Sequence, residues 1–273
     1  MGAEARRWCS LALGYARVMS LYDAAAATFT RDRALPDATA EAIRSAILAA
    51  VDATRPRLLD LGAGTGRVGR AFVAAGDDYV GMDLSLAMLH EFAQRGAARL
   101  VQADGAHLPF RDGTFDAVML IQVFGGMREW RRVLAEARRV LRPAGALVIG
   151  RTVAPPDGLD ARMRQRLTTI LDEMGVAREG GNRREEAVRF LEQSASASCI
   201  RAAAWEADRT PRGFLERHRT GARFAALPAP IKDAALGKLA GWASAAFGSL
   251  DRVLREPHYF ELRVFKFQTN RGS

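Results

Sequence analysis

Short apolar runs alternate with amphipathic stretches along the middle of the chain, from about residue 57 to residue 153. This alternation predicts βαβ units, in which buried parallel strands are joined by helices that cover the sheet. The predicted strands are 58–61, 79–82, 100–102, 117–121 and 146–149. Between the last two, apolar residues recur at helical spacing from Trp130 to Leu141, and Arg142-Pro143-Ala144-Gly145 is expected to end that helix.

Helical periodicity dominates the flanks of this core. Residues 1–50 are predicted to form an amino-terminal helical lid segment, and residues 51–153 form the core itself. Residues 154–195 are predicted to be a helical insertion that acts as a substrate lid, with Asn182 and Glu185 spaced as a capping box. Residues 196–273 are expected to complete the sheet with a strand at 200–205, a helix opened by Thr210-Pro211, a helix over about 229–247 and a last strand at 259–267.

The strongest chemical signal follows the first predicted strand, where Asp60 precedes a loop with glycine at positions 62, 64 and 66. Glycine lets the backbone turn tightly and lets a ligand lie against it, although a tight turn without a ligand is the alternative. Gly64, Gly66 and Gly69 also fit the dinucleotide pattern G-x-G-x-x-G, which is a weak signal by itself. Asp60 argues against a dinucleotide because its carboxylate would repel a pyrophosphate, whereas it suits a ligand with a cationic ammonium group.

Asp83 ends the second predicted strand, where a carboxylate can accept hydrogen bonds from both hydroxyls of a ribose. The alternative is that Asp83 caps the helix that follows it. Any nucleoside cofactor would use a carboxylate at this position, so Asp83 does not identify the cofactor.

Four separated motifs carry a resemblance to a known family. They are Asp60-Leu-Gly62-Ala-Gly64-Thr-Gly66; Gly81-Met-Asp83-Leu-Ser85; Ala103-Asp104-Gly105-Ala-His-Leu-Pro109-Phe110; and Phe115-Asp116-Ala-Val118 with Arg139-Val-Leu-Arg142-Pro143-Ala-Gly145. In this order they resemble the class I methyltransferases that depend on S-adenosylmethionine (SAM), in particular the broad type 11 group that includes ubiquinone and menaquinone biosynthesis methyltransferases. The resemblance implies an α/β fold with a Rossmann-like seven-stranded sheet, mostly parallel with an antiparallel last strand, helices on both faces and a helical lid.

The resemblance also implies a set of cofactor-binding residues. Asp60 would lie near the amino group of SAM, Asp83 would hold the ribose, and Asp104 would accept a hydrogen bond from the adenine amino group. Gln122 would lie close to the methionine tail and the reaction centre. The full set is Asp60, Gly62, Ala63, Gly64, Gly66, Asp83, Leu84, Met88, Asp104, Gly105, Ala106 and Gln122. For Asp104 the alternative is a turn aspartate, and Asp116 is interpreted as a structural residue.

The chain departs from the family in two places. Phe29 stands where these enzymes often have a lid tyrosine, and the segment after Gln122 lacks the histidine that many relatives have near Phe124 and Gly125. No residue is therefore assigned as a general base, and packing or surface roles are expected for the four histidines. Tyr15, Tyr22, Phe124, Arg151 and Trp205 are expected to line the acceptor site.

Composition narrows the function further. The formal charge is +9, but only three of the 40 basic residues are lysine and the arginines are scattered, so a basic surface is preferred to a nucleic-acid footprint. Two distant cysteines, Cys9 and Cys199, indicate neither a disulfide framework nor a metal site, and no apolar run is long enough to span a membrane.

A cytoplasmic SAM-dependent methyltransferase acting on a small molecule is predicted. An RNA methyltransferase, a nicotinamide-dependent oxidoreductase and a non-catalytic SAM-binding protein remain as alternatives.

Overall fold

A seven-stranded sheet forms the centre of the computed structural model, which describes residues 23, 26, 35–125, 127, 129–176, 182–219 and 227–267. The strands are β1 (Leu58–Leu61), β2 (Tyr79–Asp83), β3 (Arg99–Gln102), β4 (Phe115–Ile121), β5 (Leu141–Val153), β6 (Ala195–Arg209) and β7 (Leu254–Phe267). Their order across the sheet is β3-β2-β1-β4-β5-β7-β6. The first five strands are parallel, and β7 runs antiparallel to both β5 and β6. The predicted fold class is thereby confirmed.

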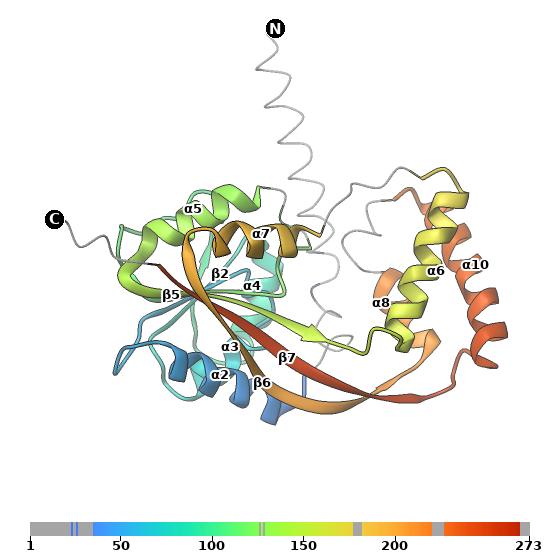
Figure 1. Cartoon of the computed structure of the whole chain (residues 1–273), viewed down its shortest axis with the longest axis horizontal. Helices are drawn as coiled ribbons and strands as arrows, with labels where there is room; N and C mark the ends of the chain where they lie inside the picture. The colour runs from blue at the N-terminus through green and yellow to red at the C-terminus, as the bar shows by residue number, and fades with distance from the viewer. Residues whose placement is uncertain are drawn as a thin grey trace, which may run out of the picture.

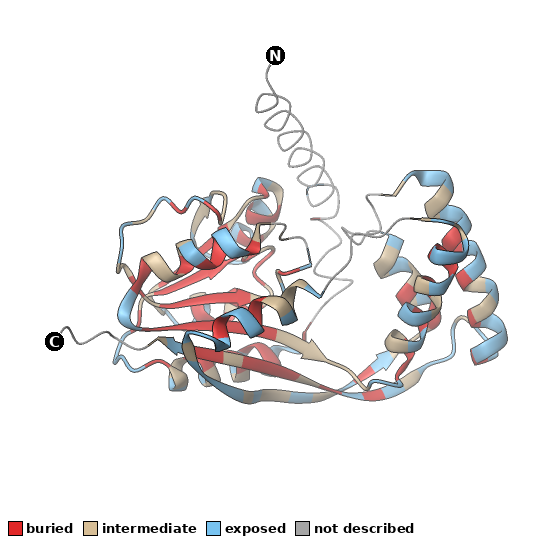
Figure 2. Cartoon of the chain, turned by 45° about the horizontal axis from the view of Figure 1, so that its top comes forward, coloured by how far each residue is buried: buried red, intermediate tan, exposed pale blue. Residues whose placement is uncertain are grey.

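Helices cover both faces of the sheet because successive strand residues point to opposite sides. Leu59, Leu61 and Leu147 pack with α5 (Trp130–Val140) and α7 (Arg183–Glu192) on one face. On the other face, Leu58 and Val148 belong to a second cluster with side chains of α2 (Asp37–Ala50), α3 (Gly69–Ala74) and α4 (Leu86–Ala93). Figure 2 shows this burial concentrated on the central strands. Burial on both faces explains why the central strands β1, β2 and β4 appear in the sequence as nearly continuous apolar runs.

Three further helices form a separate helical lobe, α6 (Leu159–Glu173), α8 (Pro211–Arg219) and α10 (Ala229–Phe247), with a hydrophobic cluster of their own. Figure 1 shows this lobe at the far end of the long β6–β7 ribbon, away from the five parallel strands. The predicted 154–195 insertion therefore contributes one helix, α6, to the lobe and the other, α7, to the core. A role of this insertion as a substrate lid stays a prediction.

The structure agrees with only some of the predicted signals for helix starts and ends. Thr210 caps α8 as expected, since its Oγ1 accepts a hydrogen bond from Gly213 N at 3.0 Å. The predicted capping box is wrong, because Asn182 precedes α7 but its side chain makes no capping hydrogen bond. The expected helix end at residues 142–145 is also late: α5 ends at Val140, and Leu141 already pairs with Phe115 in the sheet.

Several expectations fall outside the described residues. The predicted lid positions Tyr15, Tyr22 and Phe29 are among them, as is most of the amino-terminal segment 1–50. Over the part of the chain that the structure describes, none of the helices combines the length and apolarity that crossing a membrane would require.

Candidate active site

Four predicted site residues come from neighbouring strands and meet at one edge of the sheet. Asp60 lies within β1, Asp83 ends β2, Asp104 follows β3 and Gln122 follows β4. Because β3, β2, β1 and β4 are adjacent and parallel, their carboxyl ends all lie along this carboxyl edge. This is where open α/β sheets bind their ligands.

The glycine loop after β1 is shaped mostly by contacts within the protein. A Cβ atom on Gly62 would come within 2.4 Å of Val123, and one on Gly66 within 2.3 Å of the Phe92 ring. Gly69 is equally constrained, by the Tyr79 hydroxyl at 2.2 Å. Gly64 differs, because a Cβ there would meet only a backbone oxygen at 4.0 Å while its φ of +56° still favours glycine. Of the predicted loop glycines, Gly64 is therefore the one that presents bare backbone to open space.

Asp83 is held rigidly beside this open position. Its Oδ2 accepts a hydrogen bond from Gly64 N at 2.9 Å, and its Oδ1 accepts one from Ser85 N at 2.9 Å. Burial raises the pKa of Asp83 in spite of these bonds. The alternative role of Asp83 as a helix cap is wrong, since Ser85 is the cap of α4 and its Oγ accepts from Met88 N. The backbone of Leu84 also bonds to this carboxylate, which still has capacity for a further donor.

Asp60 lies deeper than the resemblance implied. Its side chain is buried, and Oδ2 accepts a hydrogen bond from the Tyr79 hydroxyl at 2.8 Å, while Oδ1 is buried without a partner. Burial raises the pKa of Asp60 to about 7, the Tyr79 hydrogen bond opposes the shift, and the nearby Asp83 adds to it. An orphaned, buried acceptor of this kind favours a cationic donor brought close to it.

Asp104 is a turn residue, as its alternative interpretation held. Its Oδ1 accepts a hydrogen bond from Ala106 N at 2.9 Å, and His107 Nδ1 lies 3.7 Å from its Oδ2. The other predicted cofactor residues flank the same edge: Met88 and Ala106 are buried, whereas Leu84 and Gly105 are half-buried. Asp116 also has its expected structural role, since it accepts hydrogen bonds from Arg57 N and from Arg142.

Gln122 has an unusual backbone at the end of β4. Its φ is +58°, the single positive value for a non-glycine residue in the described part of the chain. Its side chain bridges two elements, because Oε1 accepts from Arg67 Nη1 at 3.0 Å and Nε2 donates to Thr152 Oγ1 at 2.8 Å. Gln122 therefore ties the glycine loop to the end of β5.

Sequence reasoning missed several residues at this edge. Tyr79 was assigned only to a strand, and Thr152 carried no motif. Arg184 and Glu261 were also missed; in the structure Glu261 accepts hydrogen bonds from both Arg151 and Arg184. Arg67 directly follows the glycine motif and could have been found; the others are brought in by strands and helices distant in sequence.

The donor set at the edge fits SAM better than a dinucleotide. A pyrophosphate needs free backbone N–H groups at the turn into α3, but the N–H of Gly64 already binds the carboxylate of Asp83. The buried Oδ1 of Asp60 suits a cation, and the bare backbone of Gly64 leaves room for a ligand. No cluster of three or more metal-ligating side chains occurs among the residues that were described.

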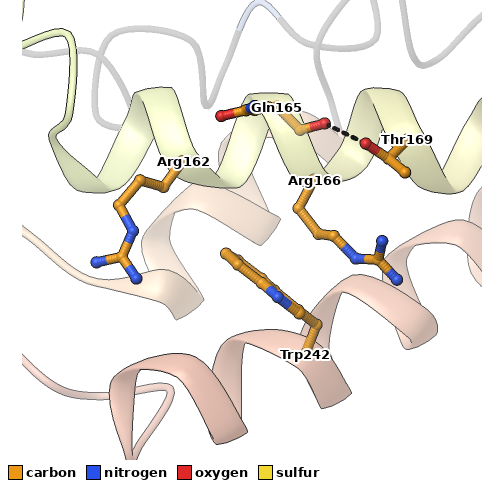
Figure 3. Close-up of a pocket in the computed structure, with 5 residues that line it drawn as sticks. All are labelled: Arg162, Gln165, Arg166, Thr169 and Trp242. Carbon is orange, nitrogen blue, oxygen red and sulfur yellow. Dashed lines mark hydrogen bonds between the residues drawn. The ribbon is translucent and has the colours of Figure 1, made fainter.

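A cavity of about 230 Å³ lies elsewhere, in the helical lobe. Figure 3 shows Arg162 and Arg166 of α6 on either side of Trp242 of α10. Arg166 pairs with Glu173 at 3.2 Å, and Thr169 donates to Gln165 O. None of the predicted cofactor residues lines this cavity, so the carboxyl edge remains the candidate site.

Residues 59–149 match a family described as methyltransferase domain. Demethylmenaquinone methyltransferase from Thermobifida fusca is 42% identical over 113 residues, which cover 39% of this chain and 48% of that protein. The protein of the same name from Streptomyces griseus is 38% identical over 137 residues, covering 48% of this chain and 59% of that protein. The chain thus spans about half the length of the curated relatives it matches.

Solved structures support the fold independently. The YcgJ protein from Bacillus subtilis aligns with a TM-score of 0.54 at 18% identity, over 83% of this chain and 98% of that one. The BH2331 protein from Bacillus halodurans gives 0.55 at 18% identity, over 83% and 99%. The domain match confirms the resemblance predicted from the motifs over residues 59–149, and these structures support the predicted Rossmann-like fold.

Proposed function

We propose that the protein transfers the methyl group of SAM to a small-molecule acceptor. The observation that carries this proposal is the hydrogen bond from Gly64 N to Asp83 Oδ2, beside the orphaned Oδ1 of Asp60. Together they give the edge an anionic lining where a pyrophosphate-bearing cofactor would need cationic or N–H donors. The motif-bearing core matches a methyltransferase domain, which is consistent with this cofactor.

Each residue would have a distinct part in binding. Asp83 is held by backbone N–H groups and would accept hydrogen bonds from the ribose hydroxyls. Asp60 would stabilise the ammonium group from beneath the loop, through its unpartnered oxygen. Asp104, with its Oδ1 used by Ala106 N, would offer Oδ2 to the adenine amino group. These roles follow from the resemblance and agree with the donors and acceptors that the side chains have left.

The chemistry that SAM supplies when bound is an electrophilic methyl group on sulfur. That methyl group would pass to a nucleophilic oxygen, nitrogen or carbon of the acceptor, with the electron pair of the broken carbon–sulfur bond left on sulfur. The protein contributes orientation and exclusion of water, which can account for most of the acceleration without a dedicated base. Gln122 would fix the distance between the glycine loop and the end of β5 during this step.

A quinone-type acceptor is the most specific reading of the comparisons, since the relatives carry the name demethylmenaquinone methyltransferase. We therefore infer an aromatic acceptor that approaches between the core and the helical lobe. The lid role of residues 1–50 and 154–195, and a cytoplasmic location, belong to the same proposal. Adding SAM should then protect both segments from limited proteolysis, and unchanged cleavage would count against the lid.

Isothermal titration calorimetry of the full chain with SAM, S-adenosylhomocysteine and NADH tests the cofactor directly. Binding of the first two and no heat from NADH is the expected result. Binding of NADH alone would overturn the proposal. A product-coupled assay with hydroquinones, phenols, amines and RNA then distinguishes an enzyme from a non-catalytic binding protein and identifies the acceptor class.

A further inference from the structure

Three charged residues meet at the carboxyl end of β5, next to the proposed cofactor site. Arg151 Nε donates a hydrogen bond to Glu261 Oε1 at 3.1 Å, and Arg184 Nη2 donates to the same oxygen at 2.9 Å. Arg151 belongs to β5, Glu261 lies opposite it on β7, and Arg184 lies in the first turn of α7. Two guanidinium groups therefore share a single carboxylate oxygen.

This cluster carries more positive than negative charge; Arg184 and Glu261 are largely shielded from solvent, whereas Arg151 is 37% exposed. The Arg184 side chain is only 13% exposed, and its Nε–H is buried without an acceptor. Burial lowers the pKa of Arg184, and the neighbouring Arg151 lowers it further. Arg263, the next arginine along β7, pairs with Glu192 at 3.1 Å. That carboxylate is therefore taken up by Arg263 and does not neutralise the extra positive charge of the cluster. A buried N–H of a guanidinium group that lacks an acceptor is costly, which favours binding of an anionic acceptor.

The backbone of the cluster lies beside Gln122, although the Arg151 side chain points to the sheet face covered by α5 and α7, opposite to that of Thr152. Gln122, the residue predicted to lie at the reaction centre, donates its N–H to Gly150 O at 2.9 Å and its side-chain amide to Thr152. These two partners are the neighbours of Arg151 on either side in β5. The cluster is thus one strand away from the end of β4, on the side opposite to Asp83 and Asp104.

We propose that Arg151 and Arg184, bridged by Glu261, form a subsite for an anionic oxygen group of the methyl acceptor, either a carboxylate or a phenolate. The proposal rests on the proposed function only in naming the bound compound as the acceptor. The cation excess of the cluster, the buried Nε–H of Arg184 and the place of Arg151 beside Gln122 are independent of it. The subsite binds and orients the acceptor and takes no part in breaking or forming bonds.

Calorimetry with 2-naphthoate and 2-naphthamide, two flat compounds that differ in charge, tests the subsite on the full chain. The wild-type protein should bind the carboxylate about tenfold more tightly than the amide, as expected for a charge-assisted hydrogen bond. Arg184→Gln should abolish this preference. Glu261→Gln should increase it, because the variant keeps the bridging oxygen but removes the negative charge.

The opposite signs of these two changes separate recognition of an anion from loss of structure, which would weaken binding in both variants. Arg142→Gln is the matched control, since it removes a β5 arginine that is paired with one carboxylate, Asp116, at the other end of the strand. Equal affinity for the two compounds, no binding of 2-naphthoate, or an unchanged preference in Arg184→Gln would overturn the subsite. SAM titrations of the same samples report on the cofactor separately, so failure of the subsite and failure of the proposed function give different results.

Discussion

The two halves of the carboxyl edge have opposite charge. At the ends of β1, β2 and β3 the charged side chains that define the site are the carboxylates Asp60, Asp83 and Asp104. At the end of β5 and on β7 and α7, two guanidinium groups share one carboxylate. Methyl transfer joins a cationic donor to an electron-rich acceptor, and this separation gives each partner a complementary half. The charge of the edge alone can thus direct the two ligands to different halves.

Removing the central carboxylate of the acidic half should have the largest effect. Asp83→Ala deletes the acceptor for two proposed ribose hydrogen bonds and releases the N–H of Gly64, so SAM affinity should fall about a hundredfold. Calorimetry measures the loss. Asp78→Ala is the control, because Asp78 lies near the start of β2 and pairs with Arg99 at the surface. Binding of 2-naphthoate should be unaffected by either change; a parallel loss in Asp83→Ala would show that the two halves are not independent.

A pair of glycines sharpens the comparison within the acidic half. Gly64 and Gly113 have similar φ values, +56° and +60°, and a Cβ on either would meet nothing closer than 4.0 Å. Alanine at either position should therefore lower the free energy of unfolding by a similar amount, about 1 kcal/mol. SAM affinity should fall about tenfold in Gly64→Ala alone, because that methyl group enters the space proposed for the cofactor. Equal SAM affinity in the two variants would mean that Gly64 faces solvent and no ligand.

The same two halves differ in how far the sequence could predict them. The acidic half lies within residues 60–104, where each carboxylate follows a short apolar run, so the strand pattern alone brings them to one edge. Arg151, Arg184 and Glu261 are separated by up to 110 residues and carry no motif. Their meeting depends on β7 inserting between β5 and β6, a pairing that hydrophobic periodicity does not encode.

Packing partners explain the other differences. The strands β1, β2 and β4 were predicted to within two residues, because burial on both faces makes them almost wholly apolar, whereas β5 is longer at both ends than the predicted 146–149. The depth of Asp60 was not predicted, since it depends on Tyr79 reaching across from β2 beneath Gly69. The division of α6 and α7 between lobe and core was missed for the same reason: a helical pattern shows which face is apolar and not which element covers it.

The pH dependence of stability should have opposite signs in the two halves. The folded protein holds a proton on Asp60 up to its pKa of about 7, whereas the unfolded chain releases it near pH 4, so ionisation of Asp60 lowers stability across this range. In thermal denaturation, the melting temperature of Asp60→Asn relative to that of the wild type should therefore rise by a few degrees between pH 4 and pH 8.

Glu261→Gln should show the reverse. Burial alone would raise the pKa of Glu261, but Arg151 and Arg184 together hold it below its usual value. Its ionised form thus stabilises the fold above the unfolded pKa, and this stabilisation is lost as the pH falls through the folded pKa. The melting temperature of Glu261→Gln relative to that of the wild type should accordingly decrease as the pH rises from about 3 to 5. The same sign in both variants would contradict the assignment of opposite charge environments.

The smallest effect is expected at the junction of the halves, where Gln122 bridges Arg67 and Thr152. Thr152→Val removes one hydrogen bond and should lower the free energy of unfolding by about 1 kcal/mol. Gln122→Gly removes both side-chain hydrogen bonds, which lowers the free energy of unfolding. Glycine also relieves the strain of the φ of +58°, about 1 kcal/mol, so the net decrease should be smaller than the loss of two hydrogen bonds would give. Thr152→Val should bind SAM and 2-naphthoate separately with nearly wild-type affinity, yet transfer the methyl group several-fold more slowly, because the spacing between donor and acceptor is no longer fixed. A wild-type transfer rate in Thr152→Val, measured in the product-coupled assay, would mean that the bridge stabilises the fold without setting that distance.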